Sequence, residues 1–199
     1  MANRNSAGFG FRQSGTLGNT PANQGLSQYW IDSAASVDLF NGMAMKSSGG
    51  YMITGESATT VTTIGVLYGI YYNAASTNKP TWAHWYDATI TPANSEDTQA
   101  FVNDYPFQKY TIASDAAVDS SVPAAHVLFM ETFSVTANTG GNTTTGKSTT
   151  TLEIGQTNNT THSWRLLRSA EEVENSDLTA AYCSLEVVQN LSEFVGTGT

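Results

Sequence analysis

Cysteine is nearly absent from this sequence. The chain of 199 residues has a single one, Cys183, so no disulfide can form within it, and its stability must come from packing or from association with other chains. The neighbouring residues Tyr182 and Leu185 favour a buried structural thiol over a reactive one. The three histidines are scattered and show no zinc-ligand spacing. We therefore expect no metal and no cofactor.

Charged residues are also scarce, at 13% of the chain compared with about 25% in typical soluble proteins. Eight Lys and Arg stand against seventeen Asp and Glu, which gives a net charge of −9. So few cations cannot neutralise many phosphates, and we expect no nucleic-acid partner. The polar surface must come from Thr, Ser, Asn, Gln and Gly, as in many extracellular and virion proteins. The same composition fits any β-rich protein with many turns.

Long hydrophobic runs are missing as well. No segment approaches the length of about 18 apolar residues that predicts a membrane-spanning helix, so we expect no membrane partner. Residues 1–12 are polar and lack the apolar stretch of a signal peptide, which predicts synthesis in the cytoplasm.

What the sequence does contain is a series of short runs rich in β-branched and aromatic residues. They begin near residue 28 and are separated by turn signals such as Asn41-Gly42 and residues 104–106. About eight to ten such runs predict an all-β fold, either a single β-barrel or a sandwich, over residues 28–195. Gly65 and Gly69 interrupt the longest run and predict bulges or a close approach of two backbones.

One helix is predicted near the end of the domain. Ser169 is followed three residues later by Glu172, the spacing of a capping box, and this predicts one or two helical turns over residues 170–176. Residues 196–199 are expected to form a C-terminal tail.

Residues 1–27 are rich in Gly, Asn, Gln and Ser, a composition that favours neither a helix nor a hydrophobic core. Aromatic residues between such flexible ones predict an extended N-terminal arm that lies on the surface of a partner. Simple disorder is the alternative. The candidate partner-contacting residues are Phe9, Phe11, Arg12, Leu17 and Trp30.

Residues 141–148, GNTTTGKS, match the phosphate-binding P-loop pattern G-x-x-x-x-G-K-S in full. That chemistry needs a buried strand before the loop and a helix after it, whose N-terminal amides hold the phosphate. Three consecutive threonines follow instead, and β-branched residues start helices poorly. We therefore predict a surface loop with an exposed Lys147.

Other catalytic patterns are equally weak. The sequence has no G-x-S-x-G nucleophile elbow, and His84, between two tryptophans, is better explained as a strand residue. No spacing places the carboxylates Glu131 and Glu153, or Asp87 and Asp104, opposite each other for glycoside hydrolysis. No catalytic residues are assigned, and the sequence favours a protein that is not an enzyme.

Trp82, Trp85 and Tyr86 are the components of a possible carbohydrate platform. Strand alternation places the two tryptophans on opposite faces, which favours one core and one surface aromatic over a shared platform.

Several short motifs, in this order, resemble those of the head decoration (cement) proteins of tailed bacteriophages. They are GFRQ at residues 10–13, FNGM at 40–43, IGVLYGIYY at 64–72, the segment from Pro80 to Trp85, VNDYP at 102–106, TGKS at 145–148 and the run at 185–190. Two positions depart from the family pattern: Gln13 stands in place of a proline and Met43 in place of an acidic residue. These departures leave room for another role in the virion.

The resemblance implies an all-β protein on the outer surface of the capsid, without catalytic residues. It implies two partners, the major capsid protein and further copies of this chain in a homotrimer. The alternative is a carbohydrate-binding or tail-fibre module, and a small hydrolase is a third possibility.

Overall fold

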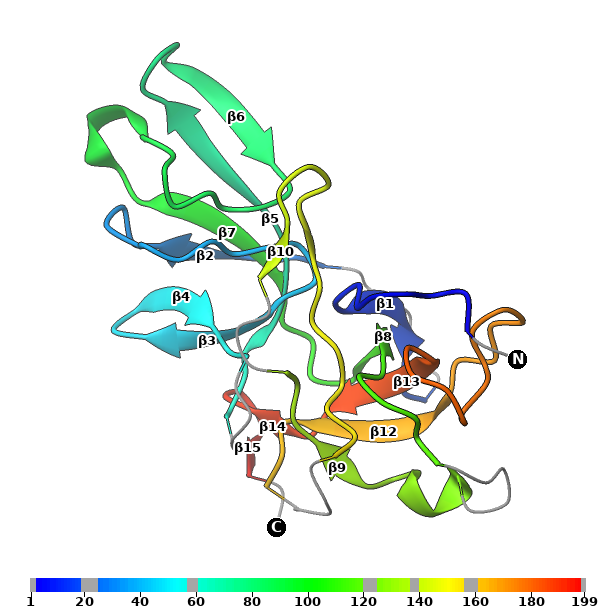
Figure 1. Cartoon of the computed structure of the whole chain (residues 1–199). Helices are drawn as coiled ribbons and strands as arrows, with labels where there is room; N and C mark the ends of the chain where they lie inside the picture. Colours follow the sequence, from blue (N-terminus) through cyan, green and yellow to red (C-terminus); the bar gives the residue numbers. More distant parts are fainter. Residues whose placement is uncertain are drawn as a thin grey trace.

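The computed structural model describes residues 3–18, 25–56, 61–119, 125–136, 140–155 and 161–197. Nearly all regular structure in these ranges is antiparallel strand, which confirms the predicted all-β fold (Figure 1). The longer strands are β1 (Arg12–Thr16), β2 (Ser27–Ile31), β3 (Ala44–Ser48), β4 (Tyr51–Thr54), β5 (Gly65–Ala74), β6 (Lys79–Ala83), β7 (Thr98–Asn103), β8 (Gln108–Ala113), β12 (Trp164–Ser169) and β13 (Ser184–Gln189).

The remaining elements are short. Five strands have two residues each: β9 (Thr132–Phe133), β10 (Gly141–Asn142), β11 (Lys147–Ser148), β14 (Leu191–Ser192) and β15 (Gly196–Thr197). Two 3-10 turns, η1 (Ala93–Ser95) and η2 (Ala125–Leu128), complete the set. Within the described ranges, no helix has the length and apolar character needed to cross a membrane.

Two large sheets dominate the described ranges, and the two-stranded sheets β10–β11 and β14–β15 accompany them (Figure 1). The five-stranded sheet has the order β1-β8-β13-β12-β9, and the six-stranded sheet has the order β2-β7-β5-β3-β4 with β6 added along β5. The upper half of β5 pairs with β6 and its lower half pairs with β3, so the β5–β6 hairpin projects beyond the rest of the sheet.

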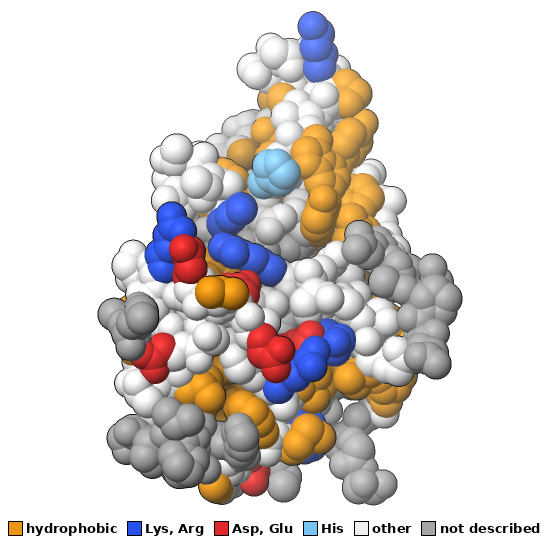
Figure 2. Space-filling model, turned by 90° about the vertical axis from the view of Figure 1, so that its right-hand side faces the viewer, with side chains coloured by type: hydrophobic (Ala, Val, Ile, Leu, Met, Phe, Trp, Pro, Cys, Tyr) orange, Lys and Arg blue, Asp and Glu red, His pale blue; other side chains and the backbone are white. Residues whose placement is uncertain are grey.

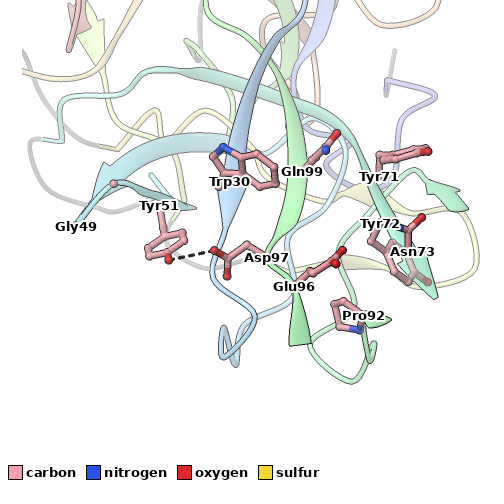
Figure 3. Close-up of a pocket in the computed structure, with 11 residues that line it drawn as sticks. Trp30, Gly49, Tyr51, Tyr71, Tyr72, Asn73, Pro92, Glu96, Asp97 and Gln99 are labelled. Carbon is pink, nitrogen blue, oxygen red and sulfur yellow. Dashed lines mark hydrogen bonds between the residues drawn. The ribbon is translucent and has the colours of Figure 1, made fainter. Parts of the chain in front are cut away.

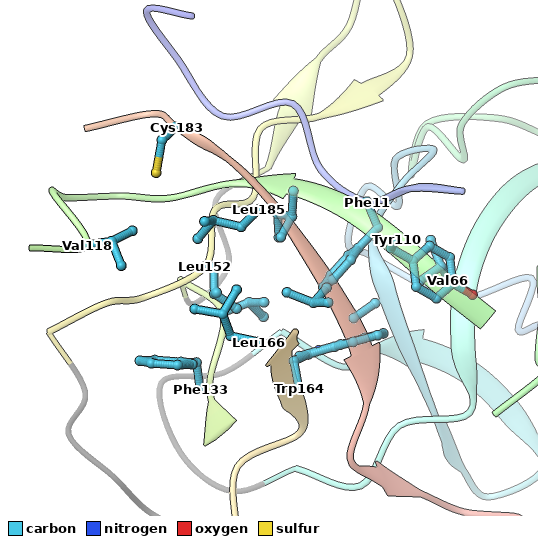
Figure 4. Packing of buried hydrophobic residues seen from close by; sticks show 14 residues of the cluster. Phe11, Val66, Tyr110, Val118, Phe133, Leu152, Trp164, Leu166, Cys183 and Leu185 are labelled. Atoms are coloured by element: carbon cyan, nitrogen blue, oxygen red, sulfur yellow. The ribbon is translucent and has the colours of Figure 1, made fainter. Parts of the chain in front are cut away.

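Each sheet has its own buried cluster. The cluster on the five-stranded sheet surrounds Trp164, Tyr110 and Leu185, and it also receives Val66 from β5 (Figure 4). The cluster of the six-stranded sheet includes Met43, Leu67 and Ile70, which are fully buried. Because Val66 and Leu67 are consecutive on one strand, β5 ties the two cores together.

The N-terminal segment corrects the predicted arm. β1 is an edge strand of the five-stranded sheet, paired with β8, and Phe11 is a core residue with 4% of its surface exposed. Gly10 makes this possible, because its φ of +69° turns the chain inward and an added Cβ would lie 2.8 Å from the carbonyl oxygen of Gly42. Residues 3–18 therefore belong to the β domain and are not a separate arm.

The predicted helix after Ser169 is wrong. Residues 170–176 form turns, and Glu171 has a φ of +55°, which no helix interior accommodates. The hydroxyl of Ser169 still accepts the amide of Glu171 at 3.2 Å, but Glu172 does not complete a capping box and accepts a hydrogen bond from the hydroxyl of Ser184 at 2.6 Å. The tertiary contacts of this segment outweigh the local sequence preference for a helix.

The ends of the predicted β domain are also shifted. β2 begins at Ser27, and β15, which pairs with β14, lies within the predicted tail of residues 196–199. Residues 198–199 lie outside the described ranges.

Candidate functional site

The outer face of the six-stranded sheet carries a row of aromatic side chains. Residues directly opposite on antiparallel strands point to the same face, and the register places Trp30 opposite Gln99, Gln99 opposite Tyr71, and Tyr71 opposite Trp82. The row therefore crosses β2, β7, β5 and β6, about 14 Å in three strand spacings.

A second set of rings extends this row. The ring of Trp82 lies 5.1 Å from that of Phe101 and 6.3 Å from that of Tyr68, measured between centroids. Trp82 and Tyr68 are each 44% exposed although they contact each other. We call Trp30, Tyr68, Tyr71, Trp82 and Phe101 together the aromatic face.

The two glycines predicted to interrupt β5 both allow close packing, and Gly69 does so at the aromatic face. The register of β5 against β7 shifts between Leu67 and Gly69, so the predicted bulge is present next to Tyr68. An added Cβ on Gly69 would lie 2.6 Å from the Trp82 ring, so Trp82 packs over the bare backbone. Gly65 lies against β7, where a Cβ would come within 2.0 Å of the carbonyl oxygen of Asn103.

One end of the aromatic face opens into a groove of about 550 Å³ (Figure 3). Trp30 and Tyr51 lie on one side and Tyr71 and Tyr72 on the other, with Glu96, Asp97 and Gln99 between them. Asp97 is fixed because it accepts hydrogen bonds from the Ser33 amide at 3.0 Å and from the Tyr51 hydroxyl at 3.1 Å. The bond to Asp97 raises the pKa of Tyr51, so this hydroxyl remains a donor.

The opposite end borders a hollow of about 200 Å³, which we call the basic hollow. Arg12 and Lys147 line it together with Phe9, Asn41 and Tyr68. Figure 2 shows Lys and Arg side chains beside a band of hydrophobic side chains that runs up the projecting part of the molecule. A smaller hollow next to it is lined by His84, Tyr68 and Lys147.

The five predicted contact residues thus have different surroundings. Phe9 and Phe11 are buried within the chain, so the interpretation of these rings as anchors in a partner is corrected. Leu17 is half-buried and donates its amide to the carbonyl of Phe107 at 2.9 Å. Arg12 and Trp30 are exposed, and the structure brings them to the basic hollow and to the aromatic face.

The P-loop pattern has a structural explanation. Residues 141–148 form the β10–β11 hairpin, in which the side chain of Asn142 accepts the amides of Thr144 and Thr145. Residues 149–155 contain no helix, so no helical amides stand behind the loop. Lys147 is exposed, as predicted.

Several of the candidate catalytic groups are engaged in local contacts. Asp87 accepts from Thr89 and has a lowered pKa for that reason, and Asp104 accepts the hydroxyl of Tyr29 at 2.7 Å. His162 is buried, with Nδ1 lying 3.2 Å from the carbonyl oxygen of Thr132, whereas His84 is exposed. In the part of the chain that the structure describes, no three His, Cys, Asp or Glu side chains gather as a metal site would require.

Cys183 is fully buried, and its sulfur lies 3.2 Å from the hydroxyl of Ser114. Burial raises the pKa of the thiol, which agrees with the structural role predicted for it.

The two tryptophans diverge, as the strand alternation predicted. Trp82 belongs to the aromatic face, whereas Trp85 stacks on the buried ring of Phe40 with centroids 5.0 Å apart. Tyr68, Tyr71 and Phe101 were not among the predicted contacts. Simple alternation along the sequence did not show that these side chains point outward together, because their orientation depends on the bulge at Tyr68.

Comparisons of the chain with protein-family models, with curated proteins and with solved structures found no match.

Proposed function

We propose that this chain is a structural protein of a virus particle that binds the outer surface of a tailed-phage head through its aromatic face. It bridges subunits of the major capsid protein and performs no catalysis. The observation that carries the proposal is the contact of Trp82 with Tyr68 and Phe101, in which Trp82 and Tyr68 are each 44% exposed and Phe101 is half-buried.

The composition of this face suits a protein partner. Trp and Tyr are enriched among the residues that dominate binding energy at protein interfaces, because they bury a large area with few rotatable bonds. A contiguous exposed apolar patch on a soluble protein marks an interaction site. The rings lie on a hydrogen-bonded sheet, so little conformational freedom is lost when a partner covers them.

Binding of this kind stabilises the head by mass action. A protein that binds the expanded shell and not the unexpanded one shifts the equilibrium toward the expanded form, by RT ln(1 + [L]/Kd) for each site. The sequence resemblance supplies the shell as partner and a homotrimer as the bound form. The chain's net charge of −9 fits an outer location, away from the packaged genome.

The test is co-sedimentation of the purified chain with expanded heads that lack it. The double variant Trp82→Ala/Tyr68→Ala should lose binding by about 30-fold or more, since hot-spot truncations cost about 2 kcal/mol or more. Val173→Ala is the control, because Val173 is 97% exposed and outside the face. Equal binding by all three proteins would refute the proposal.

The groove supports a second candidate, a module that binds a neutral glycan. Sugar rings stack on aromatic faces, and their hydroxyls donate to fixed carboxylates such as Asp97. Under this alternative, Trp30→Ala and Asp97→Ala abolish binding on a glycan array, whereas Trp82→Ala/Tyr68→Ala retains some of it. Under the head-binding proposal, the wild-type chain binds no glycan on the array.

A further inference from the structure

The basic hollow concentrates positive charge in an acidic protein. Four of the other six cations are engaged: Arg4 pairs with Glu174, Lys109 and Arg168 pair with Glu186, and Arg165 donates to the Met130 carbonyl and to Asn190. Lys46 lies on β3, in the β3–β4 hairpin, and Lys79 on β6, in the β5–β6 hairpin. Arg12 and Lys147 line one hollow with no acidic partner in the described ranges.

Both cations are held by their surroundings. The Cζ atom of Arg12 lies 3.8 Å from the centroid of the Phe9 ring, a cation–π contact that holds the guanidinium over the ring. Lys147 belongs to β11, and its backbone forms a parallel bridge with Asn41. The side-chain amide of Asn41 donates to the carbonyl of Tyr68, so Asn41 links Lys147 to the aromatic face.

We propose that the basic hollow binds a carboxylate side chain that the partner inserts when it covers the aromatic face. The inference rests on the proposed function, and it specifies the chemical group that the partner places in the basic hollow. A guanidinium edge pairs with both oxygens of a carboxylate, and an ammonium beside it adds a point charge. Tyr68 borders the hollow and also belongs to the aromatic face, so a single partner surface contacts both the hollow and the face.

A hollow of about 200 Å³ accommodates a Glu or Asp side chain but not a folded element. Two like charges held near each other repel, so a bound anion relieves a cost that the free protein carries. Inorganic phosphate is also an anion that arginine and lysine bind, so the test must distinguish free phosphate from a carboxylate side chain.

The first experiment needs no partner. The isolated chain is titrated with the peptide Ac-Gly-Glu-Gly-NH₂, with its Gln counterpart and with inorganic phosphate, while the Nε–Hε resonance of Arg12 is followed by NMR. The Glu peptide should give a saturable shift that the Gln peptide does not give and that Lys147→Ala removes. Equal responses to Glu and Gln peptides overturn the proposal, and so does saturation by phosphate at lower concentration than by the Glu peptide.

The second experiment uses expanded heads. Arg12→Glu/Lys147→Glu should weaken binding by about 30-fold or more, since unpairing a charge at an interface costs about 2 kcal/mol or more. Lys46→Glu/Lys79→Glu changes the net charge equally and should bind within about twofold of wild type. Equal losses in the two variants contradict a specific site. If the wild type itself does not bind heads, the proposed function fails. The peptide titration still decides whether the basic hollow binds a carboxylate.

Discussion

The rings of Phe11 and Trp164 lie 4.1 Å apart between centroids, tilted by 34°. Tyr110 closes this trio, with its ring 5.7 Å from each of the other two and nearly perpendicular to Trp164 (Figure 4). Edge-to-face and offset contacts of this kind stabilise aromatic clusters beyond their buried area. The N-terminal segment is thus held in the core of the five-stranded sheet.

Phe11→Ala should therefore destabilise the protein by about 3–5 kcal/mol, the range for truncating a buried aromatic residue. Urea denaturation followed by tryptophan fluorescence measures this change. Phe107→Ala is the matched control, because Phe107 is 49% exposed, and it should change the free energy of unfolding by less than about 1 kcal/mol. Equal stabilities of Phe11→Ala and wild type would mean that the segment is a free arm after all.

Glu186 on β13 links the strands of the same sheet. Its carboxylate lies 3.0 Å from Lys109 on β8 and 2.8 Å from Arg168 on β12, and it accepts from Ser14 on β1 at 3.3 Å. Burial alone would raise the pKa of Glu186, but the hydrogen bonds and charges of Lys109 and Arg168 outweigh it, so the pKa lies below its ordinary value. The folded protein thus holds this carboxylate charged more readily than the unfolded chain does.

The stability from Glu186 is then complete above the unfolded pKa of about 4.3 and is lost as the pH falls through the lower folded pKa. Glu186→Gln should cost about 1–3 kcal/mol at pH 7, and the difference from wild type should shrink below about pH 4. Urea titrations at several pH values measure this, with the exposed Glu96→Gln as control. A difference that stays constant down to pH 2 would contradict the charge-based explanation.

Gly65 is required by the close approach of β5 to β7. Gly65→Ala places a Cβ 2.0 Å from the Asn103 carbonyl oxygen and should destabilise the protein by about 1–3 kcal/mol, the cost of overpacking. Gly155→Ala, whose Cβ meets no atom within 4 Å, should stay within about 0.5 kcal/mol of wild type. Thermal unfolding of the two variants compares them directly, and similar melting temperatures would refute this reading of β5.

The hairpin at residues 141–148 should bind no nucleotide, despite its P-loop pattern, because no helix follows it. Calorimetric titration with ATP and Mg²⁺ should show no saturable heat up to millimolar concentration. Micromolar binding that disappears in Lys147→Ala would contradict this prediction.

Much of the fold could be predicted because period-2 patterns and turn residues are local. The alternation on either side of residues 104–106 predicted the two strands β7 and β8, which belong to different sheets, and Gly69 marked the bulge. The N-terminal segment was misread because its composition resembles that of a disordered arm. Gly8 and Gly10 serve close packing instead, and the partners of Phe11 lie far along the chain on β8 and β12.

The candidate site was less accessible to sequence reasoning. Arg12 was predicted as a contact on an arm and Trp30 as a contact in the β domain, and only the register shows that Trp30 shares a row with Tyr71 and Trp82. A hollow formed by Arg12 and Lys147, which are distant in sequence, depends on how β1 and β11 are placed by the two sheets.

Electron cryo-microscopy of expanded heads, with and without the added chain, tests the central claim most directly. The account predicts extra density on the outer surface, with Trp82, Tyr68 and Phe101 against the shell and a carboxylate of the capsid protein beside Arg12 and Lys147. Heads without added density, or a bound chain whose aromatic face points into solvent, would contradict it.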